Sequence, residues 1–339
     1  MESNSYRRAG FTQVELLVVC LIIAVILSIA IPAVQSVREA SRRMQCQKRL
    51  QQIGEAIVSF EAAQQALPAT QAPANDHFLL GLTYSNTYFS AHVHLLPYLD
   101  LGVLYNELNV NSPIAFSRNP DLLPAATRTP IEVFLCPSDG ESRGTNYRAC
   151  TGPAAYAING KLDPEGGLGA FPTLERVRTR DIRDGLSCTV FMCEKRKSSG
   201  LPHSFQENDF WFSGAYDFFG YQPSTTQVIT ICNSLSGQPQ HYQSNCGRTW
   251  AITGYDFTLY NHAVTPNADC FDCSVQSYAG TDGTPSGGGV YKASSYHRGG
   301  VNCVFGDAHV QFVSDSIDLN VWRALSTRAG GEVVNVPGG

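Results

Sequence analysis

A long apolar segment lies near the start of the chain. Residues 16–33 read LLVVCLIIAVILSIAIPA, and Ser28 carries the only polar side chain among them. About eighteen consecutive apolar residues are enough to cross a bilayer as a helix, and in lipid a helix satisfies its own backbone hydrogen bonds. The pattern therefore predicts a transmembrane helix over about residues 14–33.

The same helix is predicted to continue with one apolar face. Its apolar positions recur at steps of four and three residues: Cys46, Leu50, Ile53, Ile57 and Phe60. This is the spacing of an amphipathic helix, and basic and amide side chains occupy the other positions. Pro68 disfavours the helical state in the residue before it. One long helix is therefore expected over residues 11–67.

The remainder, residues 68–339, is rich in loops and contains short runs typical of strands. These runs are residues 131–135, 189–193, 227–232, 301–305 and 309–313, and a last helix is expected over 316–328. The final two runs are predicted to pair across Gly306, Asp307 and Ala308. A dominant N-terminal helix packed on a large antiparallel β-rich head makes the expected fold class α+β.

Charge and cysteine content narrow the class of protein. The 24 basic and 29 acidic residues give a net charge of −5, so no bulk attraction to nucleic acid is expected. Eleven cysteines are present, ten of them outside the apolar segment. This favours disulfides in an oxidising compartment, although the pairing does not follow from the sequence. The alternative is a set of small buried hydrophobic residues.

Glu15 lies just inside the apolar segment, where a carboxylate is costly. A charged group at the centre of a bilayer costs about 2.5–3.5 kcal/mol and less near its edge, so such a group normally has a partner. A secretory signal peptide would use Arg7 and Arg8 as its basic start, but its apolar core has only about 7–15 residues. A plain membrane anchor remains possible, but it leaves Glu15 unexplained.

The residues Gly10-Phe-Thr-Gln-Val-Glu15 resemble the processing site of prepilins. The resemblance implies that a prepilin peptidase cuts between Gly10 and Phe11, removes residues 1–10 as a leader and methylates Phe11. It also implies that Glu15 pairs with the N-terminal amine of a neighbouring subunit. Such a buried pair is satisfied only when two subunits stand in the right register.

The expected function follows from this resemblance. The chain is expected to be a structural subunit of a type IV pilus-like or type II secretion pseudopilus-like filament, and not an enzyme. Its expected partners are the prepilin peptidase/N-methyltransferase, other pilin-like subunits and the inner membrane, with the head in the periplasm or outside the cell. The alternative is a membrane-anchored exported solute-binding protein or enzyme.

Several further segments resemble large pilin-like proteins of planctomycete-type bacteria, the DUF1559 family with its C-terminal H-x9-DG signature. The matching segments are residues 38–46, 50–53, 95–99, 134–139, 181–186, 296–302 and 313–318. The signature falls on His297 and Asp307, and Ala308 replaces its glycine. Because Asp-Gly favours a tight turn with positive φ, this replacement puts the turn geometry in question.

Candidate chemistry in the head is sparse. No P-loop, dinucleotide-binding fingerprint, HExxH, GxSxG or EF-hand motif is present. His297 and Asp307 are interpreted as a hydrogen-bonded pair that orders the last hairpin, because two ligands alone do not make a zinc site. His92 and His94 would share one face of a strand.

Two further groups of residues are weak candidates for a redox or metal site. Cys270 and Cys273 have redox spacing but lie in a loop, which favours structural disulfides. Asp269, Asp272 and Asp282 are weak candidates for calcium, since no fixed ligand spacing supports them. No other metal or cofactor is expected.

Overall fold

The computed structural model describes most of the chain in two units, residues 1–44 and 45–339. The residues described are 12–70, 89–108, 110, 123–155, 157–158, 161–162, 168–172, 176–201, 206, 208–212, 224–235, 242–274 and 289–332. Helix α1 (Gln13–Gln64) passes from the first unit into the second as one continuous helix, as predicted. Pro32 lies inside it without ending it.

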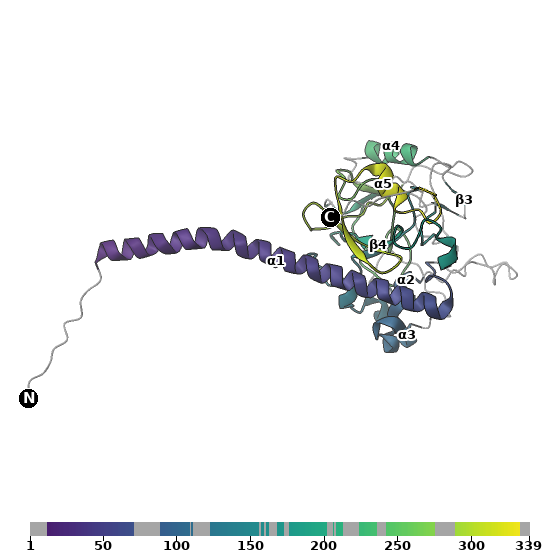
Figure 1. Ribbon diagram of the computed structural model, residues 1–339, viewed down its shortest axis with the longest axis horizontal. Helices are drawn as coiled ribbons and strands as arrows, with labels where there is room; N and C mark the ends of the chain where they lie inside the picture. Colours follow the sequence, from purple (N-terminus) through teal and green to yellow (C-terminus); the bar gives the residue numbers. More distant parts are fainter. Residues whose placement is uncertain are drawn as a thin grey trace, which may run out of the picture. The chain divides into compact units, whose positions relative to one another are not determined.

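The second unit combines short helices with three sheets (Figure 1). Its helices are α2 (Ala91–Leu95), α3 (Gly102–Glu107), α4 (Thr225–Leu235) and α5 (Leu319–Ala324). The 3-10 helices are η2 (Leu96–Leu99), η4 (Ala125–Arg128), η5 (Glu132–Phe134) and η6 (Thr179–Asp181). The α+β class with a long N-terminal helix is therefore confirmed.

The largest sheet has five strands in the order β11-β10-β4-β1-β7. They are β11 (Val310–Ser314), β10 (Gly300–Phe305), β4 (Val190–Glu194), β1 (Tyr147–Cys150) and β7 (Leu259–Tyr260). Four neighbouring pairs join these strands, and β1–β7 alone among them is parallel. The sheet is thus mixed, whereas the sequence predicted an antiparallel one.

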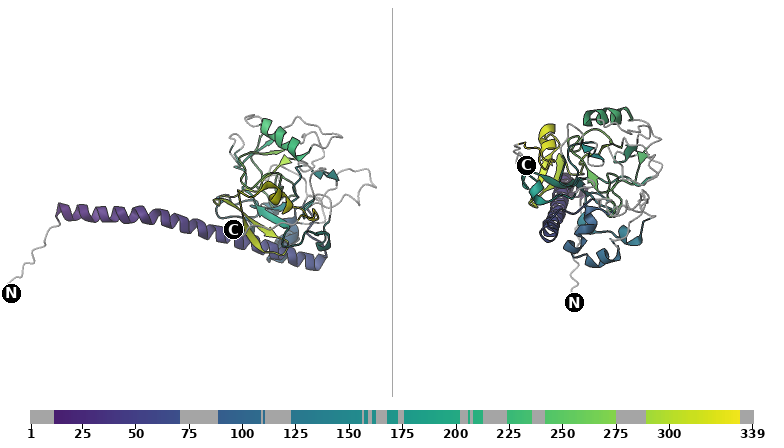
Figure 2. Two further views of the ribbon diagram at one scale, coloured as in Figure 1. Left: turned by 45° about the horizontal axis from the view of Figure 1, so that its top comes forward. Right: turned by 90° about the vertical axis from the view of Figure 1, so that its right-hand side faces the viewer.

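Two smaller sheets complete the head. One has the order β6-β5-β8-β9, with strands Tyr242–Gln243, Phe210–Phe212, Asp272–Ser274 and Gly289–Val290, and its β5–β8 pair is parallel. The other pairs β2 (Ala157–Ile158) with β3 (Lys161–Leu162). Helix α4 packs beside β8 and β9, away from the second half of α1 (Figures 1 and 2).

The second half of α1 is buried through the face that the sequence predicted. Cys46, Leu50, Ile53 and Ile57 have no exposed surface, and Phe60 is half-buried against Tyr98 of η2. Helices α2 and α3 lie beside the last turns of α1 (Figure 2). The apolar face predicted by a period of 3.6 residues therefore forms part of the main core.

One face of the five-stranded sheet receives this helix. Because side chains alternate along a strand, Asn302 and Val304 of β10 share a face, while Cys303 points the other way. The Asn302 and Val304 face contacts α1, since Gln47 Nε2 donates to Asn302 Oδ1 at 3.1 Å. On the opposite face, Cys303 forms a disulfide with Cys193 of the neighbouring strand β4.

Two strand predictions are wrong. Residues 131–135 contain η5, in which the Phe134 N–H donates to Ile131 O, a local turn that replaces strand pairing. Residues 227–232 lie inside α4, whose buried Val228 and Cys232 are one helical turn apart. A short run of β-branched residues is compatible with a strand or a helix. Here the run forms a helix, because one helical face packs into the interior. The predictions for β4, β10, β11 and the last helix are confirmed, although α5 is shorter than expected.

Gly54 of α1 packs against the hairpin of β10 and β11. A Cβ atom at this position would lie 2.6 Å from Val304 Cγ2 and 3.2 Å from Ala308 Cα. Glycine is normally unfavourable inside a helix by about 1 kcal/mol relative to alanine. The close packing therefore overrides helix propensity at this position.

We predict that Gly54→Ala destabilises the protein by about 1–3 kcal/mol, because overpacking outweighs the gain in helix propensity. Urea unfolding measures the change, and the exposed Gln52→Ala on the same helix is the control, with a shift within about 0.5 kcal/mol. A stabilised Gly54→Ala variant would show that the helix and the hairpin do not touch here.

Two buried histidines make the fold sensitive to acid. Burial lowers the pKa of His92 to about 4 and that of His262 to about 3. His92 Nε2 lies 2.7 Å from Tyr147 O, so the neutral ring donates to this carbonyl. His262 stacks on Trp322, and its Nδ1 lies 2.6 Å from Trp322 O.

We predict that stability falls as the pH is lowered from about 6.5 to about 4. Over this interval the unfolded chain binds protons at these histidines and the folded chain does not, which favours unfolding by up to about 3 kcal/mol for His92. Urea unfolding at pH 7 and pH 4.5 measures this. His92→Gln retains an N–H donor but does not titrate, so this variant should lose less stability between pH 7 and pH 4.5 than the wild type does. An equal loss in both proteins would show that His92 is not responsible for the pH dependence.

Candidate functional site

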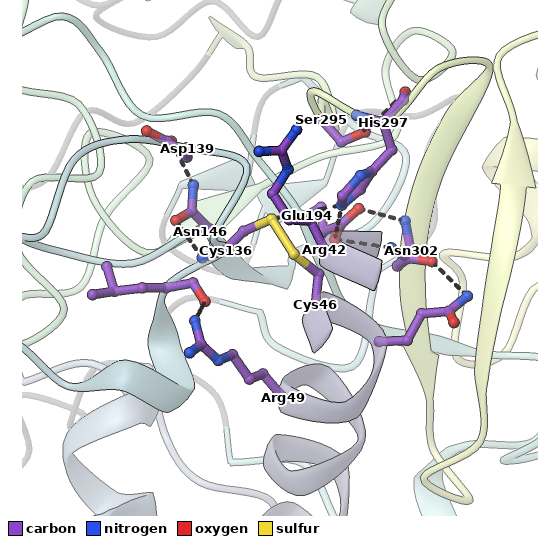
Figure 3. The surroundings of a disulfide bond; sticks show 12 residues. Arg42, Cys46, Arg49, Cys136, Asp139, Asn146, Glu194, Ser295, His297 and Asn302 are labelled. Atoms are coloured by element: carbon purple, nitrogen blue, oxygen red, sulfur yellow. Dashed lines mark hydrogen bonds and ion pairs between the residues drawn. A yellow bond between two sulfur atoms is a disulfide. The ribbon is translucent and has the colours of Figure 1, made fainter. Parts of the chain in front are cut away.

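Three of the segments that carry the family resemblance meet in the core, around a disulfide between Cys46 and Cys136 (Figure 3). Cys46 lies in α1, Cys136 follows η5, and His297 precedes β10. All three are buried, with exposed fractions of 0, 6 and 3 %. Residues far apart in sequence are thus brought to one point by packing α1 against the sheet.

Glu194, at the end of β4, joins this group. Its Oε1 lies 3.4 Å from His297 Nε2, and His297 Nε2 lies 3.6 Å from Cys136 Sγ. The ligand-type atoms of Cys46, Cys136, Glu194 and His297 all lie within 4.8 Å of one another. Among the residues that the structure describes, no other group of three or more His, Cys, Asp or Glu side chains is as close.

Asn302 of β10 orients the Glu194 carboxylate. The Asn302 N–H donates to Glu194 Oε2 at 2.8 Å, and Asn302 Nδ2 donates to Oε1 at 2.9 Å. Gln47 Nε2 in turn donates to Asn302 Oδ1 at 3.1 Å. These contacts make Glu194 a hydrogen-bonded residue of the buried core.

A second polar network lies on the Cys136 side. Asn146 Oδ1 accepts from the Cys136 N–H at 2.9 Å and from Lys197 Nζ at 2.9 Å. Asn146 Nδ2 donates to Asp139 Oδ2, and Lys197 Nζ lies 3.8 Å from the same oxygen. Burial lowers the pKa of Lys197 to about 8, and the Asp139 carboxylate opposes this shift.

A polar cavity of about 230 Å³ opens beside His297. Its lining includes His297, Asn267, Asp272, Lys292 and Asp315. Asp272 forms an ion pair with the buried Lys195 ammonium, and burial lowers the pKa of Lys195. The cavity thus brings polar and charged side chains next to the buried His297.

The two signature residues do not meet. His297 precedes β10 and Asp307 follows it, so the six residues of this strand, about 20 Å of extended chain, separate them. Asp307 is exposed and contacts His309 Nδ1 at 2.5 Å. The expected His297–Asp307 hydrogen bond is therefore wrong.

Ala308 adopts the turn conformation for which the signature provides glycine. Its φ is +68°, in the left-handed region that favours glycine, and its N–H donates to Phe305 O at 2.9 Å. The hairpin is thus formed without the glycine, at the cost of a strained residue. The question about this turn is resolved in favour of the positive-φ geometry.

Other candidate residues are used structurally. His92 and His94 lie on the short helix α2 and not on a strand. Cys273 forms a disulfide with Cys232, while Cys270 is a free thiol. Asp272 is held by Lys195 and by the Lys292 N–H, Asp269 is exposed, and Asp282 lies outside the described residues.

At the start of α1, Thr12 and Glu15 form a capping box. The Thr12 N–H donates to Glu15 Oε2 at 2.8 Å, and the Glu15 N–H lies 3.3 Å from Thr12 Oγ1. The Thr-x-x-Glu spacing was visible in the sequence, but the capping role was not predicted. Gly10 and Phe11 lie outside the described residues.

The convergence at Glu194 was also missed. Nothing in the strand pattern of residues 189–193 indicates that the next residue meets a histidine about a hundred positions later. The only local indication is an acidic residue at the end of an apolar strand, and this does not reveal which residue it contacts. The partner became visible only through the pairing of β4 with β10.

We predict that Glu194→Gln destabilises the folded chain by about 1–3 kcal/mol, because the amide sets an N–H₂ against the donors of Asn302 in a buried site. Urea unfolding at fixed redox state measures this. The exposed Glu55→Gln of α1 is the matched control and should change stability by less than about 0.5 kcal/mol. Equal effects would show that the Asn302 contacts contribute nothing.

One of the comparisons with known proteins gave a match. No curated protein and no solved structure matches the chain. A family model described as protein of unknown function (DUF1559), with the short name SBP_bac_10, matches residues 35–320. This match includes Cys46, Cys136, Glu194 and His297 and covers most of the chain, so the protein belongs to the DUF1559 family.

Proposed function

We propose that the chain is a structural subunit of a pilus-like or secretion pseudopilus-like filament, processed between Gly10 and Phe11 and assembled through α1. The family membership and the apolar helix are compatible with an exported or membrane-anchored protein. The finer assignment rests on the side chains of the first half of α1.

The first half of α1 exposes apolar side chains all round. Its most apolar window has a mean hydropathy of 3.1, and none of that window is buried. Val14, Leu21 and Ile29 are 68, 65 and 69 % exposed. Burial of such side chains is worth about 1.5–3 kcal/mol each, so this surface requires lipid or other helices around it. This is the observation that carries the proposal.

The continuity of α1 supports a filament subunit over a simple anchor. The helix runs for 52 residues, and its second half forms part of the core of the head. A membrane anchor needs only about 20 residues and no rigid continuation. A filament subunit does need a rigid continuation, because the packing of its helix in the filament must fix where its head lies.

Glu15 supports the same proposal through its charge. The capping box with Thr12 satisfies backbone donors at the helix start, but glutamine at this position serves equally well. Capping therefore does not require a carboxylate. An ion pair with the N-terminal amine of a neighbouring subunit does require one, and in the prepilins that this segment resembles, cleavage produces that amine.

A membrane-anchored solute-binding protein is the second candidate. A cavity of about 430 Å³ lies where α1 ends, and Arg176, Arg178 and Arg180 line it together with Glu61. Its size is within the range of small-molecule sites, and its arginines suit an anionic ligand. This candidate predicts an uncleaved N-terminus and anion binding by the isolated protein.

The first prediction is that the mature chain in membranes of its native host begins at N-methylated Phe11. Mass spectrometry of the purified protein reads the terminus directly. A chain that begins near Met1 would favour the anchored solute-binding protein, and one that begins near Ala33 would exclude any role of α1 in a membrane.

The second prediction separates the charge of Glu15 from its capping role. Glu15→Gln keeps the capping box and removes the charge, so it should abolish recovery of the chain in sheared filaments while leaving expression unchanged. Thr12→Ala removes the cap, at about 1 kcal/mol, and keeps the charge, so it should assemble. Assembly of Glu15→Gln at the wild-type level would contradict the pairing role.

A further inference from the structure

The cluster of Cys46, Cys136, Glu194 and His297 has the composition of a metal site. We propose that the thiol form of the chain binds one zinc-class divalent ion through these four side chains, and that disulfide formation between Cys46 and Cys136 excludes the ion. The site is thus either cross-linked or metallated. This inference does not depend on the filament proposal.

The distances around His297 fit tetrahedral coordination. With zinc bonds of about 2.0–2.3 Å, neighbouring ligand atoms lie roughly 3.3–3.8 Å apart. His297 Nε2 lies 3.6 Å from Cys136 Sγ and 3.4 Å from Glu194 Oε1. Two edges of the tetrahedron are therefore already formed. The two sulfur atoms, bonded to each other in the oxidised chain, separate when each binds the metal.

The donor set selects the class of metal. Two thiolates, one imidazole and one carboxylate are ligands that zinc accepts, whereas calcium and magnesium require oxygen alone. All four residues are at most 6 % exposed, which matches a closed structural site. Binding converts two thiols to thiolates and releases two protons, so no oxidant or reductant takes part in this step.

The surrounding residues hold the ligands in place. Asn302 fixes both oxygens of Glu194, and Gln47, the neighbour of Cys46 in α1, holds Asn302. On the other side the Cys136 N–H donates to Asn146, which also accepts from the Lys197 ammonium. Hydrogen bonds of this kind orient ligands and raise metal affinity. The positive charge of Lys197 favours a nearby thiolate.

The cavity beside His297 brings polar side chains next to the site. Asp272 and Asp315 line it together with Arg196, Lys292 and Arg298, so an ion that approaches the imidazole passes side chains of both charges. The disulfide alone requires neither Glu194 nor His297. A metal ion would explain why a buried carboxylate and an imidazole are held beside the two cysteines.

The proposal is tested on the full-length chain in detergent, reduced with a phosphine under anaerobic conditions and then freed of reductant. Cobalt(II) is the probe, because thiolate-bound tetrahedral cobalt has a charge-transfer band and intense visible d–d bands. We expect one cobalt per reduced chain, displacement of the band by one equivalent of zinc, and no band in the oxidised chain. Bound metal should also protect Cys46 and Cys136 from alkylation.

Variants assign the ligands. His297→Gln and Cys46→Ser should weaken cobalt binding by about 100-fold or more, and Asn302→Ala, which keeps all four ligands, by about 10–100-fold. Cys232→Ser is the matched control, because it also removes a disulfide cysteine but leaves the site intact, and it should bind as the wild type does. Circular dichroism verifies that each variant is folded.

Three outcomes would overturn the proposal. The first is a folded, reduced wild-type chain that shows no thiolate–cobalt band. The second is a band that survives in the Cys46→Ser, Cys136→Ser double variant. The third is a reduced chain that unfolds and does not refold when cobalt is added.

Discussion

The fold depends on the packing of the second half of α1 against the five-stranded sheet. Cys46, Leu50, Ile53 and Ile57 fill one side of the main core, and Gly54 allows the hairpin of β10 and β11 to approach the helix backbone. The Cys46–Cys136 disulfide makes this contact covalent. In the chain-entropy model, a cross-link that closes a loop of this length stabilises a domain by about 4–5 kcal/mol. The chemical site at Cys46 is therefore located in the contact that organises the head.

The sequence predicted two kinds of feature in this structure. The apolar face of α1 follows from its spacing, and the strands at residues 189–193 and 301–305 and the last hairpin follow from short strand-like runs bounded by turn residues. The two wrong strands, at residues 131–135 and 227–232, are runs whose β-branched or aromatic residues fit a strand but whose packing favoured helical turns. Local propensity is a weak guide where a run is shorter than two turns of helix.

The candidate site was beyond prediction for a different reason. Its members come from α1, the loop after η5, the end of β4 and the loop before β10, and their only link in sequence is that three of them lie in segments typical of one family. His297 was recognised through that signature, but its partner was expected to be Asp307. Strand β10 holds the two apart, and Glu194 takes the place next to the imidazole because β4 and β10 are neighbours. Contacts that depend on the order of strands in a sheet cannot be predicted from the local sequence of either strand.

The disulfides also determine how tension passes through the molecule. A pull applied to the start of α1 and to the C-terminus reaches Cys46 and crosses directly to Cys136, which is 90 positions further along the chain. It then crosses from Cys193 to Cys303, which are 110 positions apart. The segments enclosed by these two links are thus removed from the path of the force. An oxidised head can lengthen only by the few stretches outside the links, so its extensibility is set by covalent chemistry.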